Sequence, residues 1–360
     1  MPLSIGPNVY ESGLIFGYDI TDTKNSFLGK PTVNYISNPT EEMARGEFGQ
    51  YRDLAPTFDT HGLVPYSLSM DIKANKPGGV YVYMQNGSSS RYGFVGSSVN
   101  ATMEYQRFYF NNITPYLATP SDTAATLATY TGYGSGVNPT VRNIQLEKGT
   151  YSTPFVNGTR SDTQSLVDLA GSATINVSAV SFNSSGKITF DGTNDSLVIS
   201  NAAQLKNNRT SIEFVIKYNA TPSGDIIQFG VGSGSYAQYY YRAYSGYSYF
   251  NWYPANSLGY SEIAIPNGVF GIGNYKHVVM TGDPYGQLKF FVNGVQQSGS
   301  TWTKYSTPSE WTPANLTVGG FTWDGYSNSD IPYLKIYNRV LLDSEITSHF
   351  NQVKTKFSIQ

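Results

Sequence analysis

Six short runs decide the fold of this chain: Lys187-Ile-Thr-Phe-Asp-Gly-Thr-Asn-Asp195, Thr210-Ser-Ile-Glu-Phe-Val-Ile-Lys217, Lys276-His-Val-Val-Met-Thr281, Gly286-Gln-Leu-Lys-Phe-Phe-Val-Asn-Gly294, Leu316-Thr-Val-Gly-Gly320 and Ile331-Pro-Tyr-Leu-Lys-Ile-Tyr-Asn-Arg339. They follow one another between Phe182 and Asn351. β-Branched and aromatic residues, which favour strands, fill the runs, and Gly, Asn and Asp, which favour tight turns, stand at their ends. The runs therefore predict successive β-strands.

The composition predicts an all-β protein with two domains. The chain has 360 residues, which exceeds the size at which one hydrophobic core keeps growing. Only 13% of the residues are charged, against about 25% in an average soluble domain. The 30 Tyr and 36 Gly residues suit pleated strands and tight turns better than helices.

Charge, hydropathy and cysteine content exclude several classes of partner and scaffold. The formal net charge is −2 without a basic block, so we expect no nucleic-acid partner. No apolar run approaches the length of about 18 residues that spans a bilayer, so we expect no membrane insertion. The first residues lack a secretory signal, and the absence of cysteine rules out disulfides and cysteine zinc sites.

The six runs resemble the strands of a laminin-G-like, concanavalin-A-like lectin sandwich. Members of this family usually begin with Gly-Leu-x-Phe-x-x-Asp, followed closely by a polar stretch of the type Asp-Leu-Ser-Gly-Asn. Gly13-Leu-Ile-Phe-Gly-Tyr-Asp19 matches the first piece and Leu166-Val-Asp-Leu-Ala-Gly171 the second, but the two lie far apart in the sequence. The resemblance implies a split sandwich, residues 1–25 and 157–360, with a second domain, residues 26–156, inserted in a loop after the first strand.

The inserted domain has strand-like runs of its own, such as Tyr66–Ala74 and Gly79–Met84. It resembles a jelly roll of the carbohydrate-binding-module type. Tyr105 stands where such jelly rolls often have the Trp of a Trp-Gln-Arg string. The exit segment, Val141–Arg160, resembles a recurring segment of tail-fibre and other structural proteins of bacteriophages. The resemblance implies a bacteriophage virion protein.

One short helix is expected at the C-terminus, starting near Asp343. Apolar residues recur there on one helical face: Ile346, Phe350, Val353 and Phe357. Related sequences have a Ser three residues before the Glu, where this chain has Leu342 before Glu345. We therefore expect Asp343 to be the N-cap and the helix to lie across the sandwich.

The stretch Tyr236–Tyr253 is the densest aromatic feature, with eight Tyr, one Phe and one Trp. Alternate residues of a strand share a face, so one set of rings is expected to face solvent. Such rings stack on sugars, but Tyr and Trp also fill cores and subunit interfaces, and both alternatives remain open. The glycan-binding or interface candidates, including one from a separate loop, are Tyr239, Tyr241, Tyr244, Tyr247, Tyr249, Trp252, Tyr253 and Trp323.

Two loops are rich in the hard oxygen ligands that Ca²⁺ requires in sets of about six to eight. The candidate metal ligands are Asp191, Asn194 and Asp195 in the first loop, and Asp324 and Asp330 in the second. Asp-Gly and Asn-Asp are also ordinary turn sequences, because Asp and Asn bond their own backbone. The loops thus predict either a Ca²⁺ site or plain turns, and no other cofactor is expected.

The sequence favours a binding protein over an enzyme. Glycosidases with this sandwich usually carry Glu-x-Asp-x-x-Glu on one strand, which places an acid and a nucleophile on a common face. The chain lacks this string, Glu213 and Glu262 are isolated, and His61, His277 and His349 fall in different predicted elements. We therefore predict no catalytic residues, with a glycan-degrading enzyme as the alternative from another class.

Together these features predict a bacteriophage structural protein on the virion surface, made in the cytoplasm of the bacterial host. Its expected role is adhesion to host-surface or environmental glycans, as a fibre tip or receptor-binding protein with many weak sites acting together. The expected partners are other virion proteins, cell-surface glycans and further copies of the chain, with a trimer favoured. A capsid decoration protein with a purely architectural role is the alternative.

Overall fold

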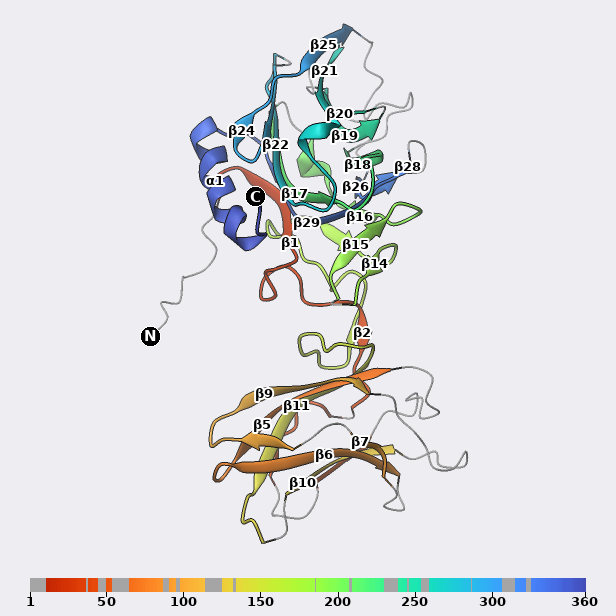
Figure 1. Cartoon of the computed structure of the whole chain (residues 1–360), viewed down its shortest axis with the longest axis vertical. Coiled ribbons are helices and arrows are strands. Elements are labelled where there is room, and N and C mark those ends of the chain that lie inside the picture. The colour runs from red at the N-terminus through yellow and green to blue at the C-terminus, as the bar shows by residue number, and fades with distance from the viewer. Residues whose placement is uncertain are drawn as a thin grey trace. The chain divides into compact units, whose positions relative to one another are not determined.

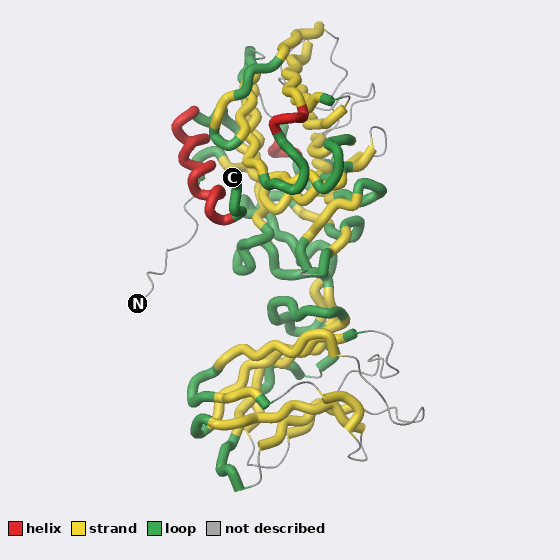
Figure 2. Tube along the Cα trace, viewed as in Figure 1, coloured by secondary structure: helices red, strands yellow, loops and turns green. Residues whose placement is uncertain are grey.

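A computed structural model of the chain describes most of its residues. The described ranges are 11–36, 38–44, 50–53, 65–86, 91–94, 98–113, 125–131, 134–184, 186–206, 209–229, 239–244, 246–253, 259–285, 287–305, 315–321 and 325–360. Antiparallel strands dominate them, with one C-terminal α-helix and two short 3-10 turns, η1 (Ala203–Leu205) and η2 (Asn267–Val269), in the same ranges (Figure 2). The predicted all-β class is confirmed.

The chain divides into two compact units (Figure 1). Unit 1 consists of Met1–Leu28, Asp162–Asn183 and Lys187–Gln360. Unit 2 consists of Gly29–Ser161 together with Ser184–Gly186. The first unit is therefore built from segments on both sides of the second in the sequence. No helix in the described ranges is long and apolar enough to cross a membrane.

Unit 1 contains two eight-stranded sheets, which we call sheet 1 and sheet 2. Sheet 1 has the order β14 (Ser181–Phe182), β15 (Ile188–Asp191), β29 (Asn328–Tyr337), β17 (Thr210–Tyr218), β22 (Lys276–Gly282), β23 (Leu288–Val292) and β24 (Val295–Gln296), and β1 (Leu14–Asp19) also pairs with β29. Sheet 2 has the order β13 (Thr174–Asn176), β16 (Leu197–Ser200), β26 (Leu316–Val318), β18 (Gly224–Phe229), β19 (Tyr239–Tyr244), β20 (Tyr247–Trp252), β21 (Gly259–Pro266) and β25 (Ser300–Tyr305). A small ribbon joins β27 (Gly320–Phe321) and β28 (Gly325–Tyr326).

The main core of unit 1 lies between these two sheets. Rings from both sheets meet in it, as in the contact of Phe214 with Tyr241 at 5.2 Å between ring centroids. The hydroxyl groups of Tyr218 and Tyr241 lie 3.0 Å apart, so the core also contains a satisfied polar bridge. This arrangement is a β-sandwich.

The first strand of the sandwich comes from the N-terminal segment, as predicted. Strand β1 pairs antiparallel with β29, and its Phe16 and Tyr18 are fully buried. The two sequence-distant pieces of the family motif also meet, because the Gly17 N–H donates to Asp168 Oδ1 at 2.9 Å. The Asp168 carboxylate further accepts from backbone N–H groups of the turn after it, so it joins β1 to residues 168–173.

The predicted C-terminal helix is confirmed as α1 (Asp343–Lys356), which packs on the face of sheet 1 opposite the main core (Figure 1). Ile346 and Val353 are its buried residues. The predicted cap was wrong: Leu342 is the N-cap and Asp343 the first helical residue. Leu342 has the extended backbone of a cap but no side-chain acceptor, so only the Glu345 half of a capping box forms, with its carboxylate accepting from the Leu342 N–H at 2.8 Å.

Unit 2 has two sheets and a core of its own. One sheet has the order β4 (Gln50–Asp53), β10 (Ala125–Thr131), β6 (Gly78–Asn86) and β7 (Arg91–Phe94), with β8 (Val99–Ala101) also paired to β6. The other has the order β3 (Met43–Ala44), β11 (Pro139–Lys148), β5 (Tyr66–Ala74) and β9 (Gln106–Ile113), and β2 (Thr32–Val33) pairs with β12 (Thr159–Arg160) in a separate ribbon. Leu68, Met70 and Ile72 of β5 are fully buried in the core.

Candidate functional site

The aromatic stretch predicted as a ligand site forms the hairpin β19–β20 of sheet 2, and half of its rings face the core. Tyr239 pairs with Trp252 and Tyr241 with Phe250 across the hairpin, and all four side chains are fully buried. Tyr253 is also buried. The prediction of a glycan-binding or interface role was therefore wrong for four residues, because buried rings offer no surface to a ligand. They are Tyr239, Tyr241, Trp252 and Tyr253.

These inward residues have structural roles. Burial raises the pKa of Tyr241 to about 12, so its hydroxyl stays protonated between Tyr218 and Ser248. The indole N–H of Trp252 donates to the Asp283 carbonyl at 3.1 Å. The Tyr241 hydroxyl and the Trp252 indole N–H are thus satisfied by the protein, whereas the buried Tyr239 hydroxyl has no hydrogen-bond partner in the described ranges.

The alternate residues of the hairpin face away from the core. Tyr244 pairs with Tyr247 across the two strands, and Arg242 pairs with Tyr249. Tyr244 is 65% exposed and Tyr247 is 45% exposed, which confirms that one set of rings faces outward. The Tyr247 and Tyr249 rings lie side by side, 6.2 Å between centroids.

Arg242 lies among these outward rings and orders them. Its guanidinium carbon is 5.1 Å from the centroid of Tyr240 and 5.5 Å from that of Tyr249. Both distances are within the range of cation–π attraction, which orients planar groups without burying them completely. The rings are therefore held in place beside a fixed positive charge.

The register of sheet 2 continues this outward surface to its edge strand. Tyr240 of β19 pairs with Asn251, Asn251 with Glu262 of β21, and Glu262 with Trp302 of β25. Trp302 is 44% exposed, whereas Asn251 and Glu262 are buried. We call this surface the aromatic face, and it consists of Tyr240, Arg242, Tyr244, Tyr247, Tyr249, Asn251, Glu262 and Trp302.

A buried polar pair lies within the aromatic face. The Asn251 amide donates to Glu262 Oε2 at 2.8 Å. Asn251 Oδ1 is buried and accepts no hydrogen bond from any residue in the described ranges. Leaving such an acceptor unpaired costs about 1–3 kcal/mol, and its burial keeps it out of reach of a ligand.

Sequence reasoning missed Asn251 and Trp302 and treated Glu262 only as an isolated carboxylate. The signal that unites them is strand register, which places residues from three strands in one row. Local sequence does not reveal that register, because the connection from β21 to β25 contains three strands of the other sheet.

The two carboxylates considered for catalysis lie on opposite outer faces of the sandwich. Glu262 is on the outward side of sheet 2, whereas Glu213 of β17 is fully buried under α1 on the outward side of sheet 1. A glycosidase needs two carboxylates that flank one bond. These two carboxylates do not form such a pair.

The described residues of the predicted Ca²⁺ loops form turns. Asp191 Oδ1 accepts from the Thr193 N–H at 2.7 Å, and Asp195 Oδ2 accepts from the Asp191 N–H at 3.0 Å. Asp330 is paired with the Lys217 ammonium at 2.6 Å. Within the described ranges no group of three or more acidic or histidine side chains is placed to hold a metal ion.

Two predicted site residues, Trp323 and Asp324, lie outside the described ranges. Asn194 is described, and its backbone N–H completes the Asp191 turn at 3.3 Å. The geometry around Asp191, Asn194 and Asp195 is that of the turn alternative, because the carboxylate oxygens bond to their own loop.

A comparison with known protein families identifies the fold of unit 1. Residues 191–347 match the laminin G 3 family, described as the concanavalin A-like lectin/glucanases superfamily. Unit 1 therefore contains a concanavalin A-like domain, as its sequence motifs predicted. A comparison with curated proteins found no match.

Solved structures also resemble part of the chain. The binding domain of botulinum neurotoxin serotype D is 15% identical over 54% of this chain and 50% of that one, with a TM-score of 0.39. The receptor-binding domain of the mosaic serotype C/D is 15% identical over 54% and 49%, with a TM-score of 0.42. A Trypanosoma rangeli sialidase is 19% identical over 54% and 31%, with a TM-score of 0.39. The chain thus covers about half, or less, of each of these structures.

Proposed function

We propose that the chain is a glycan-binding protein whose concanavalin A-like sandwich holds saccharides on the aromatic face. The observation that carries the proposal is the set of outward rings on one face of sheet 2, in which Tyr244, Tyr247 and Trp302 are 65%, 45% and 44% exposed. Exposed Tyr and Trp rings supply apolar area for the C–H face of a pyranose. The hydroxyl groups of Tyr244 and Tyr247 and the indole N–H of Trp302 supply hydrogen bonds to its hydroxyl groups.

Glycan binding is tested by removing exposed rings and measuring affinity for immobilised saccharides on a glycan array. Tyr247→Ala and Trp302→Ala should each weaken binding by about two- to tenfold, because one ring stack contributes about 0.5–1.5 kcal/mol. Tyr285→Ala is the matched control, since Tyr285 is 88% exposed and lies in the turn between β22 and β23, outside the aromatic face. Unchanged affinity in both test variants would refute the assignment.

The aromatic face is also suited to contact between copies of the chain, and this is the second candidate role. Tyr, Trp and Arg are enriched in protein interfaces, and the exposed Tyr244 and Trp302 supply such residues. A homo-oligomer, with a trimer favoured, would bury these rings. Light scattering on Tyr247→Ala and Trp302→Ala separates the roles, because an interface variant loses mass while a glycan-site variant keeps it.

The proposed setting is the surface of a bacteriophage particle, with the chain made in the bacterial cytoplasm. The resemblance of Val141–Arg160 to a segment of phage structural proteins supports it, as does the resemblance of the inserted domain to carbohydrate-binding modules. Weak lectin sites gain strength when many copies bind together, and a virion supplies those copies. Electron microscopy of particles with labelled chain would test the setting: a distal tail position supports receptor binding, and a capsid position supports decoration.

Binding without catalysis is part of the proposal. It rests on the separation of Glu213 and Glu262 by the whole sandwich. Incubation of the purified chain with each polysaccharide that it binds should release no new reducing ends. Release of reducing ends that is abolished by Glu262→Gln would establish hydrolysis instead.

A further inference from the structure

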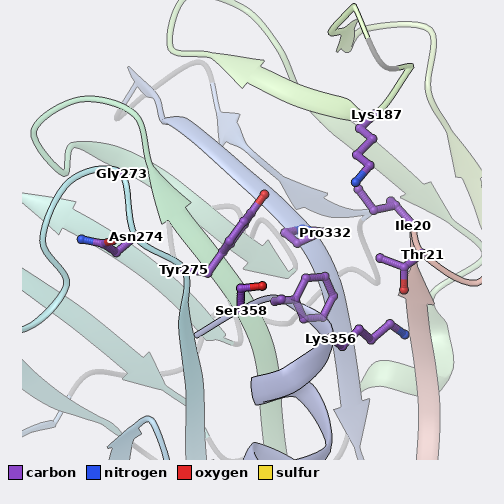
Figure 3. A pocket seen from close by; sticks show the side chains of 10 residues that line it. Ile20, Thr21, Lys187, Gly273, Asn274, Tyr275, Pro332, Lys356 and Ser358 are labelled. Atoms are coloured by element: carbon purple, nitrogen blue, oxygen red, sulfur yellow. The ribbon is translucent and has the colours of Figure 1, made fainter. Parts of the chain in front are cut away.

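Unit 1 also contains a pocket whose residues are not part of the aromatic face. Its volume is about 340 Å³, and it forms where the C-terminal end of α1 meets the residues after β1, before β15 and before β22 (Figure 3). All of its lining residues lie in the described ranges. This volume is at the lower end of the range of small-molecule sites, which is about 300–1,000 Å³.

The floor and one wall of the pocket are apolar and aromatic. Ile20 and Phe357 are buried, and the Tyr275 ring lies 6.0 Å from Phe357. Burial, with a smaller contribution from Asp330, raises the pKa of Tyr275 to about 12, so its hydroxyl stays protonated. That hydroxyl lies 3.4 Å from Asp330 Oδ2, which holds the ring in its orientation.

Two lysine ammonium groups lie at the rim of the pocket, and in the part of the chain that the structure describes only one of them is paired with a carboxylate. Lys356 is paired with the Asp19 carboxylate, which also accepts from the Thr21 hydroxyl, so its charge is compensated. The Lys187 side chain extends toward Ile20 and Thr21 in Figure 3. Within the described ranges it makes no ion pair, so the pocket contains one uncompensated positive charge.

We propose that this pocket binds a saccharide unit that carries a carboxylate, with the carboxylate on Lys187 and the sugar ring over Tyr275 and Phe357. The aromatic wall and apolar floor suit the C–H groups of a pyranose. The free ammonium suits an anion, and Thr21, Asn274 and Ser358 offer hydrogen bonds at the rim. A neutral sugar would leave Lys187 without a partner, and a small inorganic anion would leave the aromatic wall unused.

The proposal goes beyond the aromatic face, because the pocket residues come from other elements of unit 1. It is tested with the full chain by titrating glucuronate, glucose and acetate and following saturation transfer from the protein to the ligand by NMR. Glucuronate should bind up to about five times more tightly than glucose, the upper factor that one exposed charge pair contributes. It should also bind more tightly than acetate, because acetate has no ring to pack on Tyr275 and Phe357.

Lysine substitutions test whether glucuronate binds in this pocket. Lys187→Met should weaken glucuronate binding about fivefold, and Lys187→Arg should retain it, because the positive charge is kept. Lys354→Met is the matched control, since it removes the same charge from α1 at a residue that does not line the pocket. Lys187 is exposed, so all three variants should keep the thermal midpoint of the parent and any loss of binding reports the site.

Three results would overturn the proposal. Equal affinity for glucose and glucuronate would remove the role of the carboxylate. Equal affinity for acetate and glucuronate would make the pocket a plain anion site. Loss of glucuronate binding in Tyr247→Ala would move the binding to the aromatic face, whereas retention in that variant keeps the two sites separate.

Discussion

Glu213 is a fully buried carboxylate that links α1 to sheet 1. Its Oε1 lies 3.0 Å from His277 Nε2, and its Oε2 lies 2.9 Å from His349 Nδ1 on the helix. The hydroxyls of Tyr337 and Tyr333 donate to the same carboxylate at 3.1 and 3.3 Å. Burial raises the pKa of Glu213, but the hydrogen bonds from the two histidines outweigh it and hold the pKa well below its usual range.

Replacing this carboxylate should destabilise the fold. Glu213→Gln removes the charge that compensates His349, and breaking such a buried pair costs about 3–5 kcal/mol. We expect a loss of that size in the free energy of unfolding, measured by urea denaturation. Glu104→Gln, which changes an exposed carboxylate in the same way, should stay within about 0.5 kcal/mol of the parent. If Glu213→Gln lowers the free energy of unfolding by less than about 0.5 kcal/mol, the pairing of Glu213 with His349 is not needed for stability.

The same cluster predicts how stability depends on pH. The Glu213 hydrogen bond raises the pKa of His349 above its ordinary value of 6.5, so the stabilisation by charged His349 is complete below that pH and is lost as pH rises through the raised pKa. The lowered pKa of Glu213 gives stabilisation that is complete above 4.5 and is lost as pH falls further. The thermal midpoint, measured between pH 3 and 9, should therefore be highest between about pH 4.5 and 6.5 and should decrease at lower and at higher pH. His349→Gln should flatten the alkaline fall, and an unchanged profile would contradict the assignment.

Single residues also show what the sequence could predict. Alternation along β19 and β20 correctly separated two sets of rings, because successive side chains of a strand point to opposite faces. It did not reveal which set faces the core, since that depends on the second sheet, which covers Tyr239 and Tyr241. Glu213 was isolated in sequence, and the fold alone brings His349 to it from 136 residues away.

At the scale of elements, α1 begins with an unfavourable cap. Leu342 is 64% exposed and has no side-chain acceptor for the first N–H groups of the helix. Leu342→Ser should stabilise the protein by about 1 kcal/mol, because a hydroxyl completes the capping box with Glu345. The gain is measured by urea denaturation against Leu342→Ala, which removes the same exposed side chain without adding an acceptor. Equal stability of the two variants would exclude a capping effect.

The segment Val141–Arg160, the most specific string of the sequence, encloses a buried polar cluster in unit 2. Glu147 accepts from Gln145 Nε2 at 2.7 Å and from the Thr153 N–H at 2.6 Å. Arg160 donates to the Thr153 hydroxyl at 3.2 Å and to the Pro154 carbonyl at 2.6 Å. The residues that make this string recognisable are therefore explained by hydrogen bonding inside the fold, and the sequence pattern could not show that role.

Breaking this cluster should destabilise unit 2. Glu147→Ala leaves two buried donors, the N–H and the hydroxyl of Thr153, without their carboxylate acceptor, and each costs about 1–3 kcal/mol. We expect a loss of roughly 2–6 kcal/mol in the free energy of unfolding of residues 29–161, measured by hydrogen exchange of β5 and β11 amides. Glu104→Ala is the exposed control. Unaltered exchange in β5 and β11 would show that Glu147 does not stabilise this unit.

At the scale of the whole molecule, the chain leaves unit 1 after Leu28 and returns to it at Asp162, and the residues next to these two points contact each other. The Leu28 N–H donates to the Ser165 carbonyl at 2.9 Å, and the Ser26 hydroxyl donates to the Val167 carbonyl at 3.0 Å. Phe27 and Leu166 form a bridge between the same two segments and are both buried. The two ends are thus held together by contacts that lie within unit 1.

Unit 1 should therefore fold without the residues between its two segments. Joining Leu28 to Asp162 by about four Gly and Ser residues, a linker that reaches roughly 11 Å, deletes residues 29–161 and keeps every strand of sheets 1 and 2. We expect this short chain to be folded, with cooperative thermal unfolding by circular dichroism and retained glucuronate binding if the pocket is correctly assigned. A chain that starts at Asp162 is the contrasting variant, because it also loses β1.

The two shortened chains should differ sharply. Without β1 the core loses Phe16 and Tyr18, and each large cavity of this kind costs about 3–5 kcal/mol, which together approaches the total stability of a domain. The chain from Asp162 should therefore be unfolded or aggregated, while the linked chain is folded and native in its strand content. Equal folding of both would show that β1 is dispensable, and failure of both would show that unit 1 requires the residues inserted within it.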